Sequence, residues 1–132
     1  MAWYNISEVF NLTGFSKREI GVIGEDIAAG VLKERGYVIL ERNFRCRYGE
    51  IDVIARMGDT VIFVEVKTRR NRRCGFPEES VDYRKQRKLR LLAEYYLAKN
   101  HNLPRILRFD VYAIRLDETN RPESVRVLEN CF

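Results

Sequence analysis

Apolar residues recur at the spacing of an α-helix in two segments of the chain. The first segment, residues 17–35, follows a Ser16–Glu19 sequence that fits a capping box, and Gly36 is a suitable stop. The second segment, about residues 80–99, ends near Asn100. The apolar repeats consist of Ile20, Ile23, Ile27, Val31 and Leu32 in the first segment, and of Leu89, Leu92, Ala93 and Tyr96 in the second.

Shorter apolar runs bounded by turn residues predict β-strands over residues 37–40, 51–55, 61–66, 105–115 and 124–128. The last of them is predicted to be an edge strand. The resulting order, αβββαββ, predicts an α/β fold in which helices flank a mixed sheet. The first three strands favour an antiparallel meander, and the long second helix suits a crossover to a parallel fourth strand.

Charged residues interrupt the apolar run of the central hairpin, GEIDVIARMGDTVIFVEVKTR (Gly49–Arg69). Because side chains alternate across a strand, Glu65 and Lys67 share one face. If Gly58-Asp59 forms a two-residue turn, Asp52 falls opposite Glu65, and Glu50 falls opposite Lys67. A bulge or a longer loop would shift this register.

Two ionised carboxylates placed opposite each other destabilise a sheet unless a positive group lies between them. Lys67 is one candidate for that group, and a divalent cation such as Mg²⁺, which binds a few carboxylates and retains several waters, is the other. A surface ladder of ion pairs is the alternative interpretation. It accounts for Glu50 opposite Lys67 but leaves Asp52 opposite Glu65 unexplained.

The chain has 132 residues, which suits one domain, and it carries a net charge of +5 with a pI of about 9.3. Three basic clusters flank the charged hairpin, and their convergence favours contacts with the phosphates of DNA over an ordinary solvated surface. Lys85 lies on the apolar face of the second predicted helix. Its side chain therefore either points toward the site or lies with its stem along the core. The predicted nucleic-acid-binding residues are Arg45, Arg47, Arg69, Arg70, Arg72, Arg73, Lys85 and Lys88.

Several classes of protein are disfavoured by what the sequence lacks. Cys46, Cys74, Cys131 and the single His101 do not form a zinc-binding pattern, and thiols in a reducing cytoplasm are the simpler explanation. No apolar run is long enough to span a membrane, and we expect no signal peptide. No P-loop, GxSxG or HExxH motif is present. We expect residues 1–15 to form an arm or a short helix and residues 16–132 to form a single domain.

The charged hairpin resembles the core motif of the PD-(D/E)xK nuclease superfamily. Asp52 matches the acidic residue of the first strand, Glu65-Val66-Lys67 matches the Glu-x-Lys of the second, and Ile51 stands where that motif nominally has proline. Over residues 16–116 the chain also resembles the bacterial YraN family. This wider resemblance rests on Gly24-Glu25, Gly36-Tyr37, Arg42-Asn43-Phe44, Gly49-Glu50-Ile51-Asp52, Phe63-Val64-Glu65-Val66-Lys67-Thr68-Arg69, Lys85 and Arg108-Phe109-Asp110-Val111.

The resemblance implies a restriction-endonuclease-like fold and metal-dependent hydrolysis of phosphodiester bonds in DNA. It further implies likeness to archaeal Holliday-junction resolvases, and therefore branched or structured DNA as the substrate. In those enzymes a glutamate of the first helix lies near the site, a role that falls to Glu25. Periodicity alone does not choose between Glu25 and Asp26, and a solvated helix glutamate is the alternative.

On this interpretation, Mg²⁺ or Mn²⁺ binds Asp52, Glu65 and the carbonyl of Val66, with Glu50 and Glu25 as further ligands or supports. Lys67 orients or deprotonates the attacking water or neutralises the phosphorane, and a nearby dication would lower the pKa of its ammonium group. The catalytic candidates are therefore Asp52, Glu65, Lys67 and Glu25.

Two other functions fit the same residues: a non-catalytic nucleic-acid-binding module on a nuclease fold, and an adaptor that binds an acidic protein. Symmetric cutting of a junction would need a homodimer. The aromatic residues Trp3, Tyr4 and Phe10 are candidates for its interface, or they cover the core. Arg108 and Asp110 share one face of their strand and predict an ion pair within it.

Overall fold

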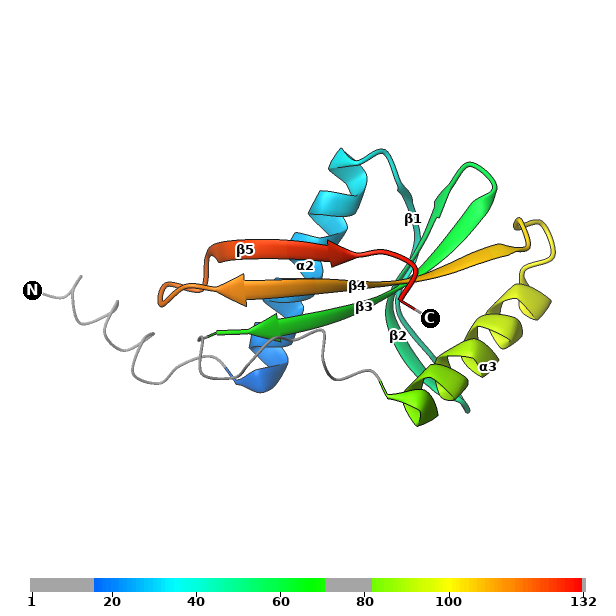
Figure 1. Ribbon diagram of the computed structural model, residues 1–132, viewed down its shortest axis with the longest axis horizontal. Helices are drawn as coiled ribbons and strands as arrows, with labels where there is room; N and C mark the ends of the chain where they lie inside the picture. Colours follow the sequence, from blue (N-terminus) through cyan, green and yellow to red (C-terminus); the bar gives the residue numbers. More distant parts are fainter. Residues whose placement is uncertain (1–15, 71–81, 132) are drawn as a thin grey trace, which may run out of the picture.

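A computed structural model describes residues 16–70 and 82–131 as two helices and five strands (Figure 1). The helices are α2 (Lys17–Glu34) and α3 (Tyr83–Lys99). The strands are β1 (Val38–Cys46), β2 (Gly49–Met57), β3 (Thr60–Arg69), β4 (Ile106–Leu116) and β5 (Pro122–Leu128). The predicted order αβββαββ and the α/β class are confirmed.

The sheet has the order β1-β2-β3-β4-β5. β1, β2 and β3 form an antiparallel meander, β3 pairs with β4 in parallel, and β5 lies antiparallel at the edge. The antiparallel meander, the parallel fourth strand and the edge position of the last strand are as predicted. The parallel pair requires a crossover, which α3 supplies, because two parallel strands cannot be joined by a tight turn.

Both helices begin and end at recognisable capping residues. The Ser16 side chain accepts a hydrogen bond from the backbone N–H of Glu19 at 3.1 Å, as the capping box predicts. Gly36, with φ of 89°, ends α2 in a left-handed conformation that glycine tolerates. Asp82 caps α3 by accepting a hydrogen bond from Lys85 N–H at 2.9 Å, and Asn100 ends the helix. The predicted start of the second helix, at residue 80, lies outside the described residues.

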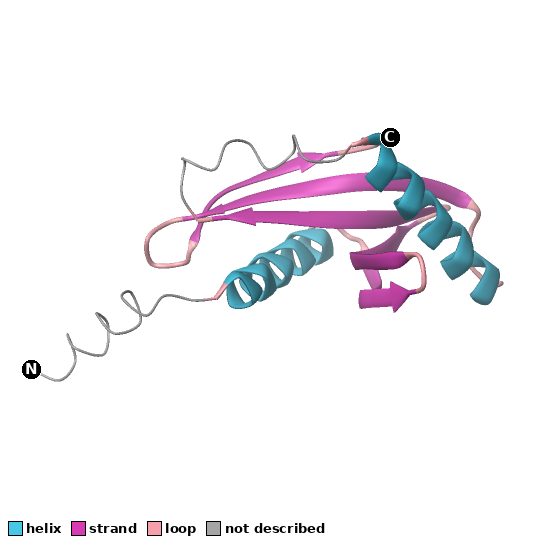
Figure 2. Ribbon diagram, turned by 90° about the horizontal axis from the view of Figure 1, so that it is seen from below, coloured by secondary structure: helices cyan, strands magenta, loops and turns pink. Residues whose placement is uncertain are grey.

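The core consists of two layers, one on each face of the sheet (Figure 2). α2 covers one face through Ala28 and Leu32. α3 covers the other through Leu89, Leu92, Ala93, Tyr96 and Leu97. The central strands are buried on both faces because both helices lie over them: Ile62 and Val64 belong to the α2 layer, and Val61 and Phe63 to the α3 layer. Glu65 and Lys67 follow in the alternation of Val61 and Phe63, and therefore lie on the α3 side.

The predicted hairpin register holds for only part of its length. Met57 pairs with Thr60 across the Gly58-Asp59 turn, and the pairing continues to Val53 opposite Val64. Beyond that point the Asp52 carboxylate accepts a hydrogen bond from the Val66 N–H at 2.7 Å. The side chain of Asp52 thus takes the place of a backbone acceptor.

The predicted pairing of Glu50 with Lys67 is wrong. Glu50 lies opposite Arg45 of β1, and their side chains form an ion pair with Nε and Oε2 2.9 Å apart. The predicted strand over residues 37–40 was also too short, since β1 continues to Cys46. Those additional residues are what bring Arg45 beside Glu50.

Candidate active site

The first helix reaches the end of β3 because glycine occupies position 24. A Cβ atom at Gly24 would lie only 1.8 Å from the Thr68 Oγ1 atom, and 2.9 Å from both Cβ and Cγ2 of Thr68. Only a residue without a side chain therefore allows α2 to approach Thr68 this closely. This approach brings Glu25, the next residue, onto the wall of the same cavity as Asp52.

Asp52 is a partly buried carboxyl in an acidic neighbourhood. Burial is the largest effect, and it raises the pKa of Asp52 from 3.8 to about 7. The negative charges of Glu65, Glu25 and Glu50 act in the same direction, in that order, while the hydrogen bond from Val66 acts against them. Removing Asp52 from water and placing three carboxylates near it makes this position attractive to a cation.

Glu65 is held by two lysines. Its Oε1 atom lies 2.6 Å from Lys85 Nζ and 3.1 Å from Lys67 Nζ. The side chains of Glu65 and Lys67 are only 13% and 14% exposed, so this cluster is largely removed from solvent. Lys85 points from α3 toward the sheet, as one of the two predicted alternatives had it.

The two lysines that share Glu65 differ in their protonation equilibria. Burial, followed by the hydrogen bond with Lys85, lowers the pKa of Lys67. Burial opposes the charge of Lys85 as well, but its bonds to Glu65 and Lys67 outweigh that effect and raise its pKa. One carboxylate is thus shared by a lysine with a lowered pKa and a lysine with a raised pKa.

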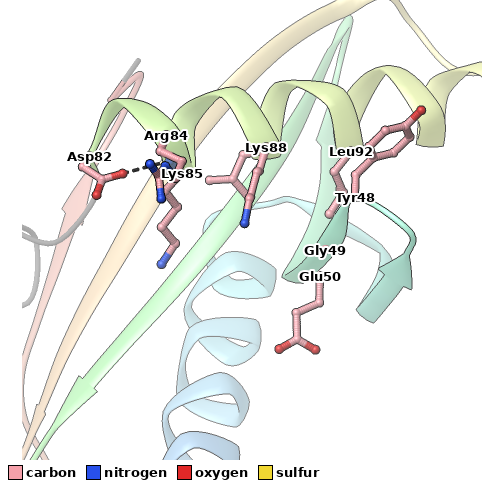
Figure 3. Close-up of a pocket in the computed structure, with 9 residues that line it drawn as sticks. Tyr48, Gly49, Glu50, Asp82, Arg84, Lys85, Lys88 and Leu92 are labelled. Atoms are coloured by element: carbon pink, nitrogen blue, oxygen red, sulfur yellow. Dashed lines mark hydrogen bonds between the residues drawn. The ribbon is translucent and has the colours of Figure 1, made fainter.

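Three cavities adjoin these residues. One of about 380 Å³ contains Asp52, Glu25 and Glu50 on its wall, and one of about 590 Å³ contains Val66 and Lys67. A third, of about 370 Å³, lies between α3 and the start of β2 and includes Lys85 (Figure 3). Gly21 of α2 lines both of the first two cavities, and Glu50 lines the first and the third. The strand ends that carry Asp52, Val66 and Lys67 therefore open onto adjoining spaces.

The two candidates on α2 differ in where they point. Glu25 lines the Asp52 cavity, and burial raises its pKa, while Arg42 and a hydrogen bond with Asn43 oppose that shift. Asp26 instead forms an exposed ion pair with Arg42, with 2.7 Å between Oδ1 and Nη2. The structure thus brings Glu25, and not Asp26, to Asp52.

The donor atoms suit a hard divalent cation only in part. Within residues 16–70 and 82–131, no group of three or more His, Cys, Asp or Glu side chains is arranged to hold a metal ion. Mg²⁺ needs only one or two carboxylates and completes its shell with water, and Asp52 and Glu65 offer two carboxylates on neighbouring strands. The oxygen donors fit Mg²⁺ or Mn²⁺, provided that Glu65 exchanges a lysine contact for the metal.

Most of the predicted DNA-binding residues surround the cavities. Arg45 lines the Asp52 cavity, Arg69 and Arg70 line the Lys67 cavity, and Lys88 lines the Lys85 cavity. Arg47 lies outside these walls and stacks its guanidinium over the Tyr48 ring, 4.9 Å from the ring centroid. The predicted residues Arg72 and Arg73, and the aromatic residues of the N-terminal arm (Trp3, Tyr4 and Phe10), lie outside the described residues.

The structure adds residues that the sequence analysis did not single out. Lys17 and Arg18 of α2 line the Lys67 and Asp52 cavities, respectively. Asn43, with φ of 55°, lines the Asp52 cavity from β1. An asparagine within a charged strand was the available signal, because Asn tolerates left-handed backbone better than most residues. Tyr48 lines the Lys85 cavity, and no pattern in the sequence pointed to it.

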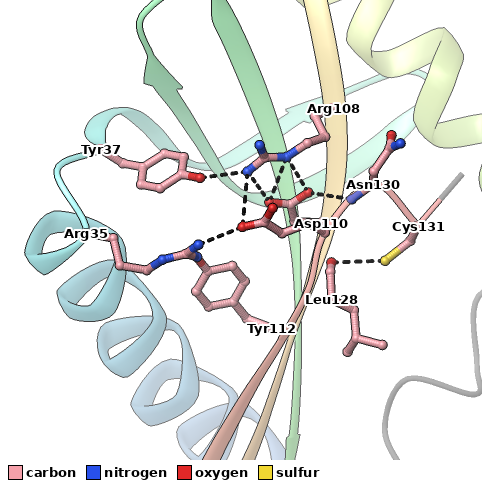
Figure 4. A network of polar contacts seen from close by, with 9 residues as sticks. Arg35, Tyr37, Arg108, Asp110, Tyr112, Leu128, Asn130 and Cys131 are labelled. Atoms are coloured by element: carbon pink, nitrogen blue, oxygen red, sulfur yellow. Dashed lines mark hydrogen bonds and ion pairs between the residues drawn. The ribbon is translucent and has the colours of Figure 1, made fainter.

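A second polar network lies away from these cavities, around Asp110 (Figure 4). The Asp110 side chain is fully buried, and Arg108 contacts it with Nη2 2.8 Å from Oδ2, which confirms the ion pair predicted within β4. Asn130 N–H also donates to Asp110 at 3.0 Å, and Arg108 Nη2 donates to Tyr37 Oη at 2.6 Å. The network ties the C-terminal segment to β4 and to Tyr37, which lies between α2 and β1, and this is a structural role.

Neither helix of the described residues is long and apolar enough to cross a membrane.

Comparison with known proteins places the chain in a family. Residues 24–114 match the uncharacterised protein family UPF0102. A UPF0102 protein of Moorella thermoacetica is 47% identical over 117 residues, which cover 89% of this chain and 98% of the relative. UPF0102 proteins of Caldicellulosiruptor saccharolyticus and Dictyoglomus turgidum are each 43% identical, covering 89% of this chain and 99% of the relative. The chain belongs to the UPF0102 family, which is the YraN family that its motifs resemble.

Proposed function

We propose that this protein is a metal-dependent nuclease that hydrolyses phosphodiester bonds of DNA, with branched or structured DNA as the substrate. The observation that carries the proposal is the convergence of Asp52, Glu65 and Lys67 at the ends of two paired strands. Asp52 contacts the backbone of β3 one residue past Glu65, and Lys67 contacts Glu65 directly. Burying two carboxylates and a lysine costs stability, and a function at this position explains why the chain keeps them there.

Asp52, Glu65 and the Val66 carbonyl would hold Mg²⁺ or Mn²⁺, with Glu25 and Glu50 supporting them across the shared cavity. When bound, such an ion polarises the phosphate and helps to ionise an attacking water. Burial and, after it, the acidic neighbours raise the pKa of Asp52, and this supports the assignment because a dication stabilises the ionised carboxylates.

Lys67 is suited to accept or position a proton. Its lowered pKa makes the neutral amine more accessible than in an ordinary lysine, so its Nζ atom orients the attacking water or takes a proton from it. Lys85, whose pKa is raised, would neutralise negative charge on the phosphate if Glu65 held the metal.

The basic residues around the cavities bind the DNA backbone without reading its sequence. Arg45, Arg69, Arg70 and Lys88 line the three cavities on either side of the acidic residues. Such contacts position a substrate and carry no base specificity. DNA as the substrate suits a cytoplasmic protein. Symmetric cutting of a DNA junction would require two copies of the chain.

One observation favours the alternative of a non-catalytic nucleic-acid-binding module. Glu65 already has two cationic partners, so its charge is compensated without a metal. In that case the cluster only stabilises the fold and the basic surface does the binding.

Cleavage assays separate these functions. Purified protein is incubated with labelled duplex, single-stranded and four-way-junction DNA in Mg²⁺, Mn²⁺ or EDTA. The nuclease proposal predicts products with metal, none with EDTA, and none from Asp52→Ala or Glu65→Ala. Binding without metal-dependent cleavage on every substrate would favour the binding module. Cleavage that survives both substitutions would indicate a contaminant or a different site.

A further inference from the structure

The cavity beside Lys85 has one apolar wall and one cationic rim. The apolar wall is formed by Tyr48, Leu89 and Leu92, and the rim carries Arg84, Lys85 and Lys88. Figure 3 shows Lys85 and Lys88 extending from the same side of α3, across from Gly49 and Glu50 of β2. A flat apolar body next to an anionic group is the ligand chemistry that matches such a wall and rim.

Tyr48 is fixed in place before any ligand arrives. Its ring lies edge-on to Tyr95, with centroids 5.9 Å apart, and its hydroxyl accepts a hydrogen bond from Arg47 at 2.7 Å. The guanidinium of Arg47 also lies over the ring. A wall that is already ordered loses little conformational freedom when a ligand packs against it.

The charges on the rim favour an anion at the α3 side. In the described part of the chain, no ion pair or hydrogen bond engages the charged groups of Arg84 and Lys88. The two carboxylates on the rim are both committed elsewhere: Asp82 caps α3, and Glu50 pairs with Arg45. Net positive charge therefore remains available for a phosphate.

The size and position of the cavity narrow the ligand to one nucleotide. Its volume, about 370 Å³, lies near the lower end of the roughly 300–1,000 Å³ typical of small-molecule sites. Lys85 belongs both to the cavity wall and to the Glu65 cluster, so a strand whose phosphate contacts Lys85 lies beside the cavity.

We propose that this cavity binds the base of a single unpaired nucleotide of a DNA strand, with the adjoining phosphate on Lys85, Lys88 and Arg84. The inference rests on the proposed nuclease function and specifies its substrate: DNA with an unpaired base next to the bond that is cut. A base inside an intact duplex does not enter, because it must first leave its stack and its partner. Bulges, flaps and junction points present such a base at lower cost.

Binding in EDTA tests the cavity without involving cleavage. Fluorescence anisotropy compares three DNAs of equal length: a perfect duplex, a duplex with one bulged nucleotide, and the same bulge with an abasic site. Wild-type protein should bind the base-containing bulge about 5- to 100-fold more tightly than the abasic bulge, the range expected for contact between one base and an aromatic wall. Tyr48→Ala should remove this preference while leaving the affinity for perfect duplex unchanged.

Two variants act as controls for that result. Tyr48→Phe keeps the ring and should retain the preference. Tyr83→Ala removes an exposed tyrosine at the start of α3 that does not line the cavity, and it should behave as wild type. Equal affinity for the two bulges in wild-type protein, or a preference that survives Tyr48→Ala, would overturn the cavity proposal and leave the nuclease proposal standing. No binding to any of the three DNAs would overturn both.

A direct titration covers the case in which Tyr48→Ala does not fold. Wild-type protein labelled with ¹⁵N is titrated with 2′-deoxyadenosine 5′-monophosphate and, separately, with inorganic phosphate. The nucleotide should shift the amide signals of Gly49, Lys88 and Leu89, whereas phosphate alone should shift those of Lys88 but not those of Gly49. Identical shifts with both ligands, or none with the nucleotide, would contradict a base-binding wall.

Discussion

Lys85 of α3 donates a hydrogen bond to Glu65 of β3 across 2.6 Å, and this contact joins the helix that crosses the sheet to the strand that carries the acidic motif. Lys67 approaches the same glutamate oxygen at 3.1 Å. One carboxylate therefore holds two ammonium groups in place. Each of them also lines a cavity: Lys85 lines the one between α3 and β2, and Lys67 lines the one that Lys17 and Gly21 of α2 line as well.

Lys85 is expected to contribute one phosphate contact. Lys85→Ala should weaken DNA binding and reduce the slope of log affinity against log salt by about one, because one fewer counterion is released. Anisotropy over a series of salt concentrations measures this slope. Lys33→Ala, which removes an exposed lysine at the far end of α2, should leave it unchanged. An unaltered slope for Lys85→Ala would show that this lysine only supports Glu65.

The hairpin and both helices could be predicted from sequence because local rules determine them. The Gly58-Asp59 turn determined the register as far as Val53 and Val64, and the cap at Ser16 located the start of α2. The polar end of β1 could not be predicted, because its outer residues are mostly exposed and show no apolar alternation. Arg45 lies in that extension, so the actual partner of Glu50 could not be predicted either.

The sequence indicated which residues lie near one another in the candidate site, but it did not predict most of their contacts. Residue types identified Asp52, Glu65 and Lys67, and helical spacing placed Lys85 on the packed face. The Val66 N–H donates to the Asp52 side chain and not to a backbone carbonyl, and the pairing of β2 with β3 ends there. The alternation of side chains along a strand does not predict which of the two acceptors is used. The position of Tyr48 depends on packing of the turn between β1 and β2 against α3, which lies far from that turn in the chain.

The raised pKa of Asp52 predicts a pH-dependent loss of stability in metal-free protein. Between its unfolded pKa near 3.8 and its folded pKa of about 7, the native state binds more protons than the unfolded state, so stability falls as pH rises through this window. Asp52→Asn keeps an oxygen that accepts from Val66 and has no charge to bury.

Urea denaturation in EDTA at pH 5 and pH 8 measures this effect as the difference between the variant and wild type. The free energy of unfolding of Asp52→Asn, relative to wild type, should increase by about 2–3 kcal/mol from pH 5 to pH 8. A difference that does not change with pH would contradict a raised pKa at this carboxyl.

Gly24 and Gly30 on the same helix should respond in opposite ways to alanine. At Gly24 the new Cβ would collide with the branched Thr68 side chain, which should destabilise the protein by about 1–3 kcal/mol. At Gly30 the new Cβ would have nothing within 4 Å, so the higher helix propensity of alanine should stabilise by about 0.5–1 kcal/mol. Thermal denaturation of both variants checks this contrast. Equal effects would show that α2 does not depend on its contact with Thr68.

Asp110 should matter for stability and not for catalysis. Asp110→Ala leaves Arg108 without its buried partner. We expect the free energy of unfolding to fall by about 3 kcal/mol, which is at the lower end of the range for broken buried ion pairs because Arg108 is partly exposed. Asp26→Ala, which breaks an exposed ion pair with Arg42, should cost less than about 1 kcal/mol. Chemical denaturation measures both. Cleavage per folded molecule should be unaltered in Asp110→Ala, and a selective loss would tie the network to the chemistry.

The most direct test of the central claim is the single-turnover rate of cleavage of a labelled four-way junction in Mn²⁺, measured for wild type, Asp52→Asn and Asp26→Asn together. We predict cleavage by wild type and by Asp26→Asn at similar rates, and a loss of at least about 100-fold in Asp52→Asn, as expected when a residue that acts on the transition state is removed. Equal rates for Asp52→Asn and wild type would contradict the claim that these carboxylates form the site of DNA hydrolysis.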